Sequence, residues 1–307
     1  MTKIMFHCDW GQNSEQLLDH YRWLTPEGSG KWGDLEGTTN KEEADFHIVM
    51  DGYPSTMDGG MPDDIDPQTV IYFQREEPQV KPPELVWDNI FYQATFTDMR
   101  HHNVAVWRVK KTYDELQNLD PRGSDVKSEV VSTVTSGKAW LPGHKMRLHY
   151  LHGLCEHLDI HLYGSNGVQN VSPNLNKRFK GELNYDGHCK FNGLYPYQYN
   201  LVLENSQNYN CLSEKIYDSL LCWCMPIYWG CPNIADFLPE GSYHIIDSIE
   251  DPWQKVAEII KQPPTEDQLN AISEARQLIL DRYNLWNEIE SIIAGSPVQP
   301  LQEITVA

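Results

Sequence analysis

The chain has 307 residues, of which 40% are hydrophobic and 11% aromatic. This composition is enough to build hydrophobic cores, so it excludes a globally disordered chain, and the length fits two ordinary domains or one large one. The formal net charge of −20 argues against nucleic acid or an anionic membrane as a partner, because both need a basic protein surface.

The cysteines are scattered along the chain, at positions 8, 155, 189, 211, 222, 224 and 231. Their number is odd and their spacing fits no disulfide framework, so reduced thiols in a cytosolic setting are the default interpretation. The start of the chain (MTKIMFHCDWGQ) does not resemble a signal peptide, because its apolar run is short and Asp9 follows at once. The longest nearly uncharged apolar run, residues 219–231, is too short to span a bilayer. We therefore expect a soluble, cytoplasmic protein without a transmembrane segment.

Strand and helix signals alternate in the N-terminal part of the chain, which predicts an α/β half. We expect strands at residues 3–7, 45–50 and 69–73 and a short amphipathic helix at residues 14–23. The third strand runs directly into residues 74–78 (QREEP). A carboxylate at this end of a strand is a candidate general base, because a base must reach the hydroxyl whose proton it takes. Composition alone, however, favours an ordinary exposed loop glutamate for Glu76.

The second half begins after a cluster of turn residues at 120–124 (DPRGS), which is the best linker candidate. The pattern then predicts a strand, a helix, a second strand and a long polar loop, at residues 129–134, 145–158, 160–164 and 165–195. Beyond the central stretch described next, we expect a last strand, two helices and a frayed tail, at residues 244–247, 251–262, 266–294 and 295–307.

The central stretch, residues 197–238, carries the densest set of signals. Residues 200–203 (NLVL) are a short apolar run of strand type, and a polar loop follows. Ser213 signals a helix start, and apolar residues recur behind it at helical spacing. Pro226 is expected to end that helix, and a second strand follows at residues 227–229. This is a βαβ unit of near-minimal length, and such units build parallel sheets with ligands at the carboxyl ends of the strands.

The polar residues of this unit lie where a ligand is expected. A helix N-terminus offers unpaired N–H groups and a partial positive charge, and Lys215 adds a full charge, so this corner is a candidate phosphate site. Glu214 would repel a phosphate, and accepting hydrogen bonds from sugar hydroxyls suits it better. For the triplet S-E-K alone, a capping glutamate and a surface lysine are the more common explanation.

The whole stretch is far more specific than its parts. ENSQ at residues 204–207, SEK at 213–215 and MPIYWGCPNIADFLP at 225–239 closely resemble the donor-binding signature of glycosyltransferase family 10, the α1,3/4-fucosyltransferases. The usual form of that signature is (F/Y)-E-N-(S/T), then (T/S)-E-K, then P-I-x-x-G. The resemblance implies that Asn205 and Glu214 orient the ribose and fucose hydroxyls. It also implies that Lys215 and the helix start at Ser213 hold the pyrophosphate of the donor.

The resemblance extends upstream over residues 129–164. Arg147 falls on the position of a family arginine that contacts the donor's pyrophosphate, a task that suits a bidentate guanidinium. The family usually has Ser-Asn at the end of the preceding strand; Ser136 is kept, and Gly137 replaces the asparagine. The family's V-D-V-Y-G corresponds to the strand that ends at Gly164.

A weaker resemblance covers residues 70–105. Glu76 matches the glutamate of the family's E-S-P segment, which is its candidate base, and Glu77 stands in place of the serine. Either glutamate could therefore be the base, and we prefer Glu76. Residues 92–104 (YQATFTDMRHHNV) are similar to F-N-x-T-x-T-Y-R-R-D-S-D-I and keep Arg100, which the resemblance assigns to the acceptor side.

The resemblance implies an α/β protein of GT-B type, with two Rossmann-like domains that face each other across a cleft. We expect an acceptor-side domain at residues 1–125, a donor-binding domain at 126–264, and at 265–307 a C-terminal helix that crosses back to the first domain, with a tail. The implied reaction moves L-fucose from GDP-β-L-fucose to a hydroxyl of a glycan acceptor, with inversion to an α-linkage. No cofactor and no metal are expected, and the partners are the nucleotide sugar and the glycan.

One departure from the family bears on the donor. The family usually has a tyrosine two residues before the T-E-K triplet, where it also reaches phosphate, and Cys211 stands there in this chain. Tyr209, two residues earlier, is a candidate substitute. The changes at Gly137 and Cys211 leave a GT-B enzyme for another nucleotide sugar as an alternative. A non-catalytic sugar-binding protein on the same fold is a third hypothesis, which the retained pyrophosphate residues argue against.

Two patterns with metal-ligand spacing are interpreted conservatively. Asp64-Ile65-Asp66 has the spacing of the DxD motif of another glycosyltransferase fold, but it lies in a Pro/Asp/Gly-rich loop, and we interpret it as solvated turn residues. His149, His152 and Glu156 could share one helical face and suggest zinc. Ordinary solvated or packed histidines are the favoured explanation, because the family does not require a metal for its chemistry.

Overall fold

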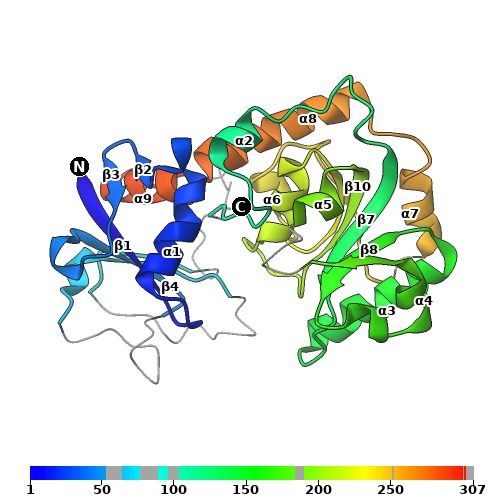
Figure 1. Ribbon diagram of the computed structural model, residues 1–307, viewed down its shortest axis with the longest axis horizontal. Helices are drawn as coiled ribbons and strands as arrows, with labels where there is room; N and C mark the ends of the chain where they lie inside the picture. The colour runs from blue at the N-terminus through cyan, green and yellow to red at the C-terminus, as the bar shows by residue number, and fades with distance from the viewer. Residues whose placement is uncertain are drawn as a thin grey trace, which may run out of the picture.

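The computed structural model describes residues 1–52, 64–76, 89–95, 104–183, 190–250, 252–299 and 301 of the chain. Its strands form two six-stranded sheets, one from β1–β6 and the other from β7–β12 (Figure 1). We propose the segments 1–125, 126–264 and 265–307 as the domains of the protein, with each sheet at the centre of one of the first two.

The N-terminal sheet has the strand order β2-β3-β1-β4-β5-β6. Its strands are β1 (Thr2–Cys8), β2 (Lys31–Trp32), β3 (Leu35–Gly37), β4 (Phe46–Met50), β5 (Val70–Phe73) and β6 (Tyr92–Ala94). All neighbouring strands are parallel except β2 and β3. β5 is buried throughout and β4 nearly so, because both faces of the sheet are covered, and this explains their continuous apolar sequences.

The C-terminal sheet is parallel throughout, in the order β12-β11-β10-β7-β8-β9. Its strands are β7 (Glu129–Ser136), β8 (His161–Ser165), β9 (Phe179–Glu182), β10 (Tyr197–Leu203), β11 (Met225–Trp229) and β12 (His244–Ile245). From β7 the chain proceeds to β8 and β9 on one side, and from β10 to β11 and β12 on the other. The carboxyl ends of β7 and β10 therefore flank the switch point, where a parallel sheet opens a crevice for a ligand.

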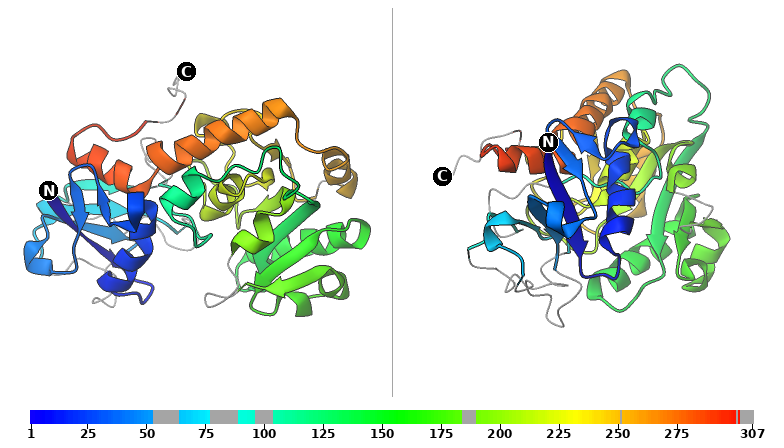
Figure 2. Two further views of the ribbon diagram at one scale, coloured as in Figure 1. Left: turned by 45° about the horizontal axis from the view of Figure 1, so that its top comes forward. Right: turned by 60° about the vertical axis from the view of Figure 1, so that its left-hand side comes forward.

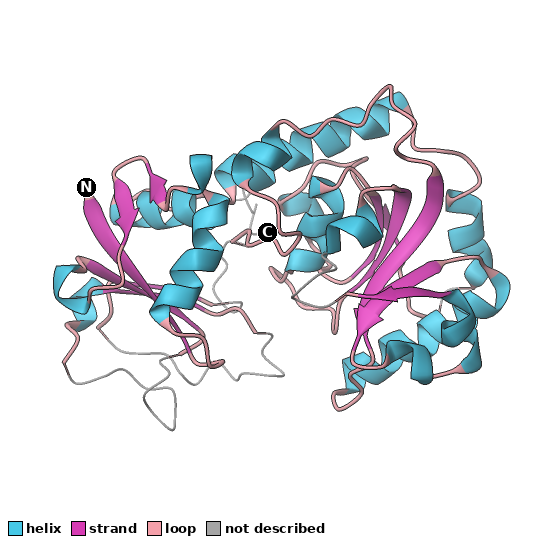
Figure 3. Ribbon diagram, viewed as in Figure 1, coloured by secondary structure: helices cyan, strands magenta, loops and turns pink. Residues whose placement is uncertain are grey.

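Helices cover both faces of the C-terminal sheet (Figure 3). The α-helices within the described residues are α1 (Ser14–Tyr21), α2 (Tyr113–Gln117), α3 (Pro142–His157), α4 (Pro173–Arg178), α5 (Lys190–Leu194), α6 (Glu214–Leu221), α7 (Trp253–Ile259), α8 (Glu266–Gln277) and α9 (Leu285–Ile293). α3 packs against α4 and α7, while α5 and α6 pack together on the other side of the sheet. None of these helices combines the length and the hydropathy needed to cross a lipid bilayer.

The C-terminal helices connect the two halves. Figure 2 shows α8 beside the C-terminal half and α9 against the N-terminal sheet. The indole N–H of Trp286 donates to the carbonyl of Tyr21 (2.9 Å), and the Trp286 ring lies 5.5 Å from the ring of Phe6. The amide of Asn284 donates to the carbonyl of Leu24 (2.7 Å). The last helix thereby completes the core of the first half.

Most of the predicted elements are confirmed, and three predictions are wrong. The single helix predicted at 266–294 is two helices, because Asn284 caps the start of α9 and interrupts the helix behind a π-helical segment, Leu278–Arg282. The polar loop predicted at 165–195 contains α4, β9 and α5. Pro226 does not end α6: the helix ends at Leu221, where Trp223 adopts φ +58°, and Pro226 lies inside β11.

Candidate active site

The first turn of α3 lies against the loop that follows β10. Gly143 makes this contact possible, because any side chain there would collide with the backbone carbonyl of Asn205. One turn later, Arg147 is 4% exposed, and its Nη1 donates to the Oδ1 of Asn205 at 2.6 Å. Two residues that the sequence assigned to the donor, from helices and loops far apart in the chain, therefore meet at the switch point of the sheet.

The N-terminus of α6 forms the second wall of this corner. Ser213 is the N-cap, as predicted, and its hydroxyl accepts the backbone N–H of Lys215 (3.2 Å) while it donates to the Glu204 carboxylate (2.7 Å). The ammonium of Lys215 lies 2.9 Å from the same carboxylate. Burial disfavours the charge of Lys215, but Glu204 and Glu214 outweigh burial and raise the pKa of its ammonium above the ordinary value. Lys215 is therefore a permanently charged cation.

Glu214 stands between two lysines. Its Oε1 lies 3.4 Å from the Nζ of Lys190 and 3.8 Å from that of Lys215. Burial alone would raise the pKa of the Glu214 carboxyl. The positive charges of Lys215, Lys190 and Arg108 outweigh burial and hold this pKa well below its ordinary value. Glu214 is therefore an ionised acceptor, as a partner for sugar hydroxyls should be.

Four residues near the corner were not assigned to the site from the sequence. Glu204 is 2% exposed and fixes Lys215. Lys190, at the start of α5, also pairs with Asp218 of α6 at 3.0 Å, and the Oδ1 of Asp218 accepts the backbone N–H of Arg108 at 2.7 Å. Of these four, only Glu204 could have been assigned to the site from the sequence, because it directly follows a predicted strand. The others come from separate segments that the fold brings together.

Ser136 and Tyr209 have different environments. Ser136 ends β7 and pairs with Ser165 of β8. A side chain at the next position, Gly137, would collide with the backbone carbonyl of Asn166, so only glycine fits there without a backbone shift. Tyr209 is 67% exposed in the loop after β10, and its role at the donor stays a prediction. The neighbouring Cys211 is buried.

The acceptor side is only partly described. Glu76 is exposed at the carboxyl end of β5, and its backbone N–H donates to Asp51 (3.0 Å). The guanidinium of Arg75 donates to the carbonyl of Val104 (2.7 Å), in the segment that leads to α2. Glu77 and Arg100 lie outside the described residues, so their assignment stays a prediction.

The metal patterns of the sequence do not form a site in the described part of the chain. No three His, Cys, Asp or Glu residues there come together as metal ligands. Asp64 forms an ion pair with Lys41, and Asp66 caps a 3₁₀ turn. These contacts agree with the interpretation of Asp64 and Asp66 as turn residues. His152 forms a hydrogen bond with the hydroxyl of Ser172 (2.9 Å). All six described cysteines are buried and form no disulfide.

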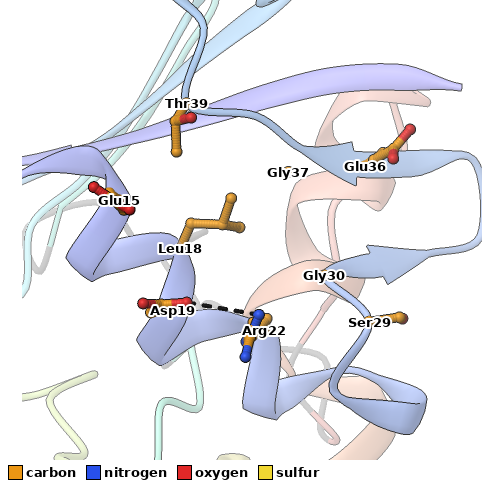
Figure 4. Close-up of a pocket in the computed structure, with 9 residues that line it drawn as sticks. All are labelled: Glu15, Leu18, Asp19, Arg22, Ser29, Gly30, Glu36, Gly37 and Thr39. Carbon is orange, nitrogen blue, oxygen red and sulfur yellow. Dashed lines mark ion pairs between the residues drawn. The ribbon is translucent and has the colours of Figure 1, made fainter.

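A cavity of about 140 Å³ lies apart from this corner, between α1 and β3 (Figure 4). Leu18 points into it, and the ion pair of Asp19 with Arg22 (3.6 Å) lies beside it. None of the residues assigned to the donor or the acceptor lines this cavity.

Known proteins resemble parts of this sequence, and a solved structure has a similar fold. Residues 125–269 match the family model "Glycosyltransferase family 10 (fucosyltransferase) C-term". An alpha-(1,3)-fucosyltransferase of Helicobacter pylori is 38% identical over 69 residues, which are 22% of this chain and 14% of that protein. A GDP-fucose protein O-fucosyltransferase 3 of Danio rerio is 25% identical over 119 residues, 38% of this chain and 25% of that protein. The chain thus matches a quarter or less of the length of these curated relatives.

The crystal structure of an α1,3-fucosyltransferase with GDP superimposes with a TM-score of 0.50 and 16% identity, over 97% of this chain and 91% of that one. This likeness confirms the predicted GT-B arrangement of two sheets. The family model covers the residues that form the corner between α3, β10 and α6. Residues 125–269, just under half of the chain, therefore match the C-terminal part of glycosyltransferase family 10, the fucosyltransferases.

Proposed function

We propose that the protein is an inverting glycosyltransferase that moves L-fucose from GDP-β-L-fucose to a hydroxyl of a glycan acceptor, in an α1,3/4-type linkage and without a metal. One observation carries the proposal: Arg147, Lys215 and the N-terminus of α6 converge at the carboxyl ends of β7 and β10. Two cations and a helix dipole at one point form a site for a diphosphate.

The donor's diphosphate would occupy this corner. The bond between the fucose C1 and the β-phosphate oxygen breaks in the reaction, and its electron pair leaves with GDP. Charge then grows on the phosphate oxygen, where the guanidinium of Arg147 and the ammonium of Lys215 stabilise it. These fixed cations do the electrostatic work that a metal ion does elsewhere. Glu214 accepts hydrogen bonds from the ribose and fucose hydroxyls, and the Asn205 amide accepts from or donates to them, so that both residues orient the donor.

Glu76 would be the base. As the acceptor oxygen forms its bond to C1 from the face opposite to GDP, the hydroxyl proton passes to the Glu76 carboxylate, and the configuration at C1 inverts. A carboxylate at the end of β5 is suited to this role, because an exposed side chain at the carboxyl edge of the sheet can meet an incoming hydroxyl. Glu77 is the second candidate for the same task.

The names of the relatives support the donor and leave two acceptor classes. The Helicobacter pylori relative is named an alpha-(1,3)-fucosyltransferase, which favours a glycan hydroxyl. The Danio rerio relative is named for GDP-fucose and for protein O-fucosylation, which makes a protein hydroxyl the alternative acceptor. A different nucleotide sugar is the second alternative, and the replacement of the family's tyrosine by Cys211 is the observation that favours it.

The experiment compares wild type, Glu76→Gln and Glu42→Gln in the release of GDP from GDP-fucose, with glycan and peptide acceptors in separate reactions. Glu42 is exposed in the same half of the protein and serves as the matched control. We expect Glu76→Gln to lower kcat by about 100-fold or more while GDP binds unchanged. Full activity of Glu76→Gln would transfer the role of base to another residue. Binding of GDP without turnover by the wild type on any acceptor would favour the sugar-binding protein.

A further inference from the structure

Asp51, directly after β4, is a buried carboxylate that the reaction described above does not use. Its side chain has no exposed surface, and its backbone has φ +62°. Burying a carboxylate is costly unless hydrogen bonds compensate, and the left-handed backbone region is uncommon for residues other than glycine. Such costs persist mainly where the surrounding structure or the function requires them. The burial and the backbone conformation of Asp51 therefore indicate that this residue has a specific role.

The hydrogen bonds of Asp51 converge on the loop that carries the candidate base. Its Oδ1 accepts the backbone N–H of Arg75 at 2.7 Å and that of Glu76 at 3.0 Å. The backbone N–H of Asp51 in turn donates to the carbonyl of Phe73 (2.9 Å). One carboxylate oxygen thereby connects the ends of two neighbouring strands and fixes two successive peptide groups, including the one from which the Glu76 side chain projects.

Among the described residues, the Asp51 side chain has no ion-pair partner and no hydrogen-bond partner other than the two backbone amides. The second oxygen, Oδ2, is buried and has no hydrogen-bond partner among the described residues. None of the ion pairs that the structure records between described residues involves Asp51. Burial raises the pKa of the carboxyl to about 6, although the two backbone N–H groups act in the opposite direction. The described contacts of the side chain are therefore the two amides.

We propose that Asp51 is a positioning residue: it fixes the backbone of Glu76 and thereby holds the base in line with the acceptor hydroxyl. The inference rests on the proposed role of Glu76 and adds a requirement to it. An exposed glutamate at the end of a strand can adopt many orientations, whereas proton transfer needs one of them. Two hydrogen bonds to one buried anchor restrict the peptide groups on both sides of the Arg75 Cα, and the second of these groups leads directly to Glu76.

Three substitutions separate the hydrogen bonds of Asp51 from its charge and its backbone. Asp51→Asn keeps an oxygen that accepts both amides and tolerates the same φ. Asp51→Gly tolerates φ +62° even better but removes the acceptor. We expect Asp51→Asn to retain kcat within about 10-fold and Asp51→Gly to lose about 100-fold, since small misplacements of a catalytic group have effects of that size. The Kd for GDP should stay at the wild-type value in both, because the donor corner lies in the other half.

A double-mutant cycle with Glu76→Gln is the decisive test. If Asp51 acts through Glu76, Asp51→Gly causes no further loss in the Glu76→Gln background. The same 100-fold loss in both backgrounds would overturn the inference, and so would wild-type kcat in Asp51→Gly. An equal loss in Asp51→Asn and Asp51→Gly would also overturn it, because the amide acceptor would then be irrelevant. Variants that do not fold would contradict it too, since Asp51 would be a structural residue first.

The two proposals fail in distinguishable ways. Full activity of Glu76→Gln removes the proposed base, whatever Asp51 does. Loss of activity in Glu76→Gln with full activity in Asp51→Gly leaves the base in place and removes only its anchor. Thermal unfolding completes the experiment. Burying a carboxylate costs stability, and Asp51→Asn removes that cost while it keeps the amide acceptor. The variant should therefore unfold at the wild-type temperature or above.

Discussion

Lys215 and Glu204 form an ion pair at the N-terminus of α6, with 2.9 Å between Nζ and Oε2. The two side chains differ in exposure: that of Lys215 is 22% exposed and that of Glu204 is 3% exposed. The glutamate is thus a fixed support, and the lysine keeps a face open to a ligand. A lysine held in this way loses little further freedom when a diphosphate binds, which favours affinity.

Lys215→Met should therefore have two separate effects. We expect donor affinity to fall by about 10- to 100-fold, because a hydrogen bond to a charged group is lost. We also expect the free energy of unfolding to fall by about 3 kcal/mol, because the substitution leaves Glu204 buried without its cation. Calorimetric titration with GDP and urea denaturation measure the two effects.

The double variant Glu204→Gln/Lys215→Met distinguishes these effects. It removes the uncompensated carboxylate, so much of the lost stability should return while donor affinity stays low. Lys177→Met, at an exposed lysine of α4, is the matched control and should change neither quantity. Donor affinity that returned together with stability would show that Lys215 only supports the fold.

Two glycines of α3 offer a comparison within one helix. Gly143→Ala would collide with the backbone of Asn205, whereas nothing lies within 4 Å of a Cβ at Gly153. We expect Gly153→Ala to stabilise the protein by about 0.5–1 kcal/mol through helix propensity. Gly143→Ala should instead destabilise it by about 1–3 kcal/mol and weaken GDP binding, because Asn205 must move. Equal effects of the two variants would mean that α3 does not contact the loop after β10 so closely.

Arg276 of α8 is a buried cation that joins separate segments. It is 4% exposed, donates to the carbonyls of Leu116, Leu119 and Leu221, and lies 4.7 Å from the ring of Trp223. Burial lowers its pKa to about 10. We expect Arg276→Lys to lower the free energy of unfolding by about 3 kcal/mol, because a lysine cannot serve three carbonyls and stack on an indole.

Arg22→Lys provides the control for this substitution, since the Arg22 side chain is 52% exposed. It should change the unfolding free energy by less than about 0.5 kcal/mol. Chemical denaturation of both variants at one pH makes the comparison. Equal stability of the two variants would show that the buried guanidinium has no structural role.

Glu288 of α9 should make stability depend on pH. It is 2% exposed, and burial raises the pKa of its carboxyl from 4.5 to about 8, although the backbone N–H of Val298 acts in the opposite direction. The folded state then binds a proton that the unfolded state has released, so this residue lowers stability as pH rises from about 4.5 to about 8. Glu288→Gln should remove that loss, which is on the order of a few kcal/mol, and be more stable than wild type at pH 8.

Unfolding midpoints measured at several pH values in this window test the prediction. Glu274→Gln, at an exposed glutamate of α8, is the control and should follow the wild-type curve. A wild-type curve that rises with pH in parallel with that of Glu288→Gln would contradict the buried, protonated state of Glu288.

Elements could be predicted from the sequence where the residue that gives the signal and its hydrogen-bond partner lie within a few positions of each other. Ser213 was predicted to cap a helix because its hydroxyl serves the N–H groups of the following residues, and the structure shows that bond. The partners of Glu214 could not be predicted in the same way. Lys190 lies 24 positions from Glu214 and begins a short helix inside a region that was predicted as a polar loop.

Two of the wrong predictions have identifiable physical causes. α4 begins with Ser172 as N-cap and Pro173 in the first turn, a local signal that its polar sequence obscured. Asn284 lies within an amphipathic pattern that continues on both sides, so periodicity alone predicts one helix. Asn284 caps α9 by accepting the backbone N–H of Trp286, and its amide also donates to Leu24, 260 positions away, a contact that no local pattern encodes.

The most direct test of the proposed donor site is a titration of the wild-type protein with GDP, UDP, CMP and GDP-fucose, each with and without EDTA, followed by calorimetry or thermal shift. We expect stabilisation by GDP and GDP-fucose alone, with the same affinity after chelation, because the fixed cations Arg147 and Lys215 would hold the diphosphate. A preference for UDP, or loss of binding with EDTA, would contradict the proposed donor and its metal-independent site.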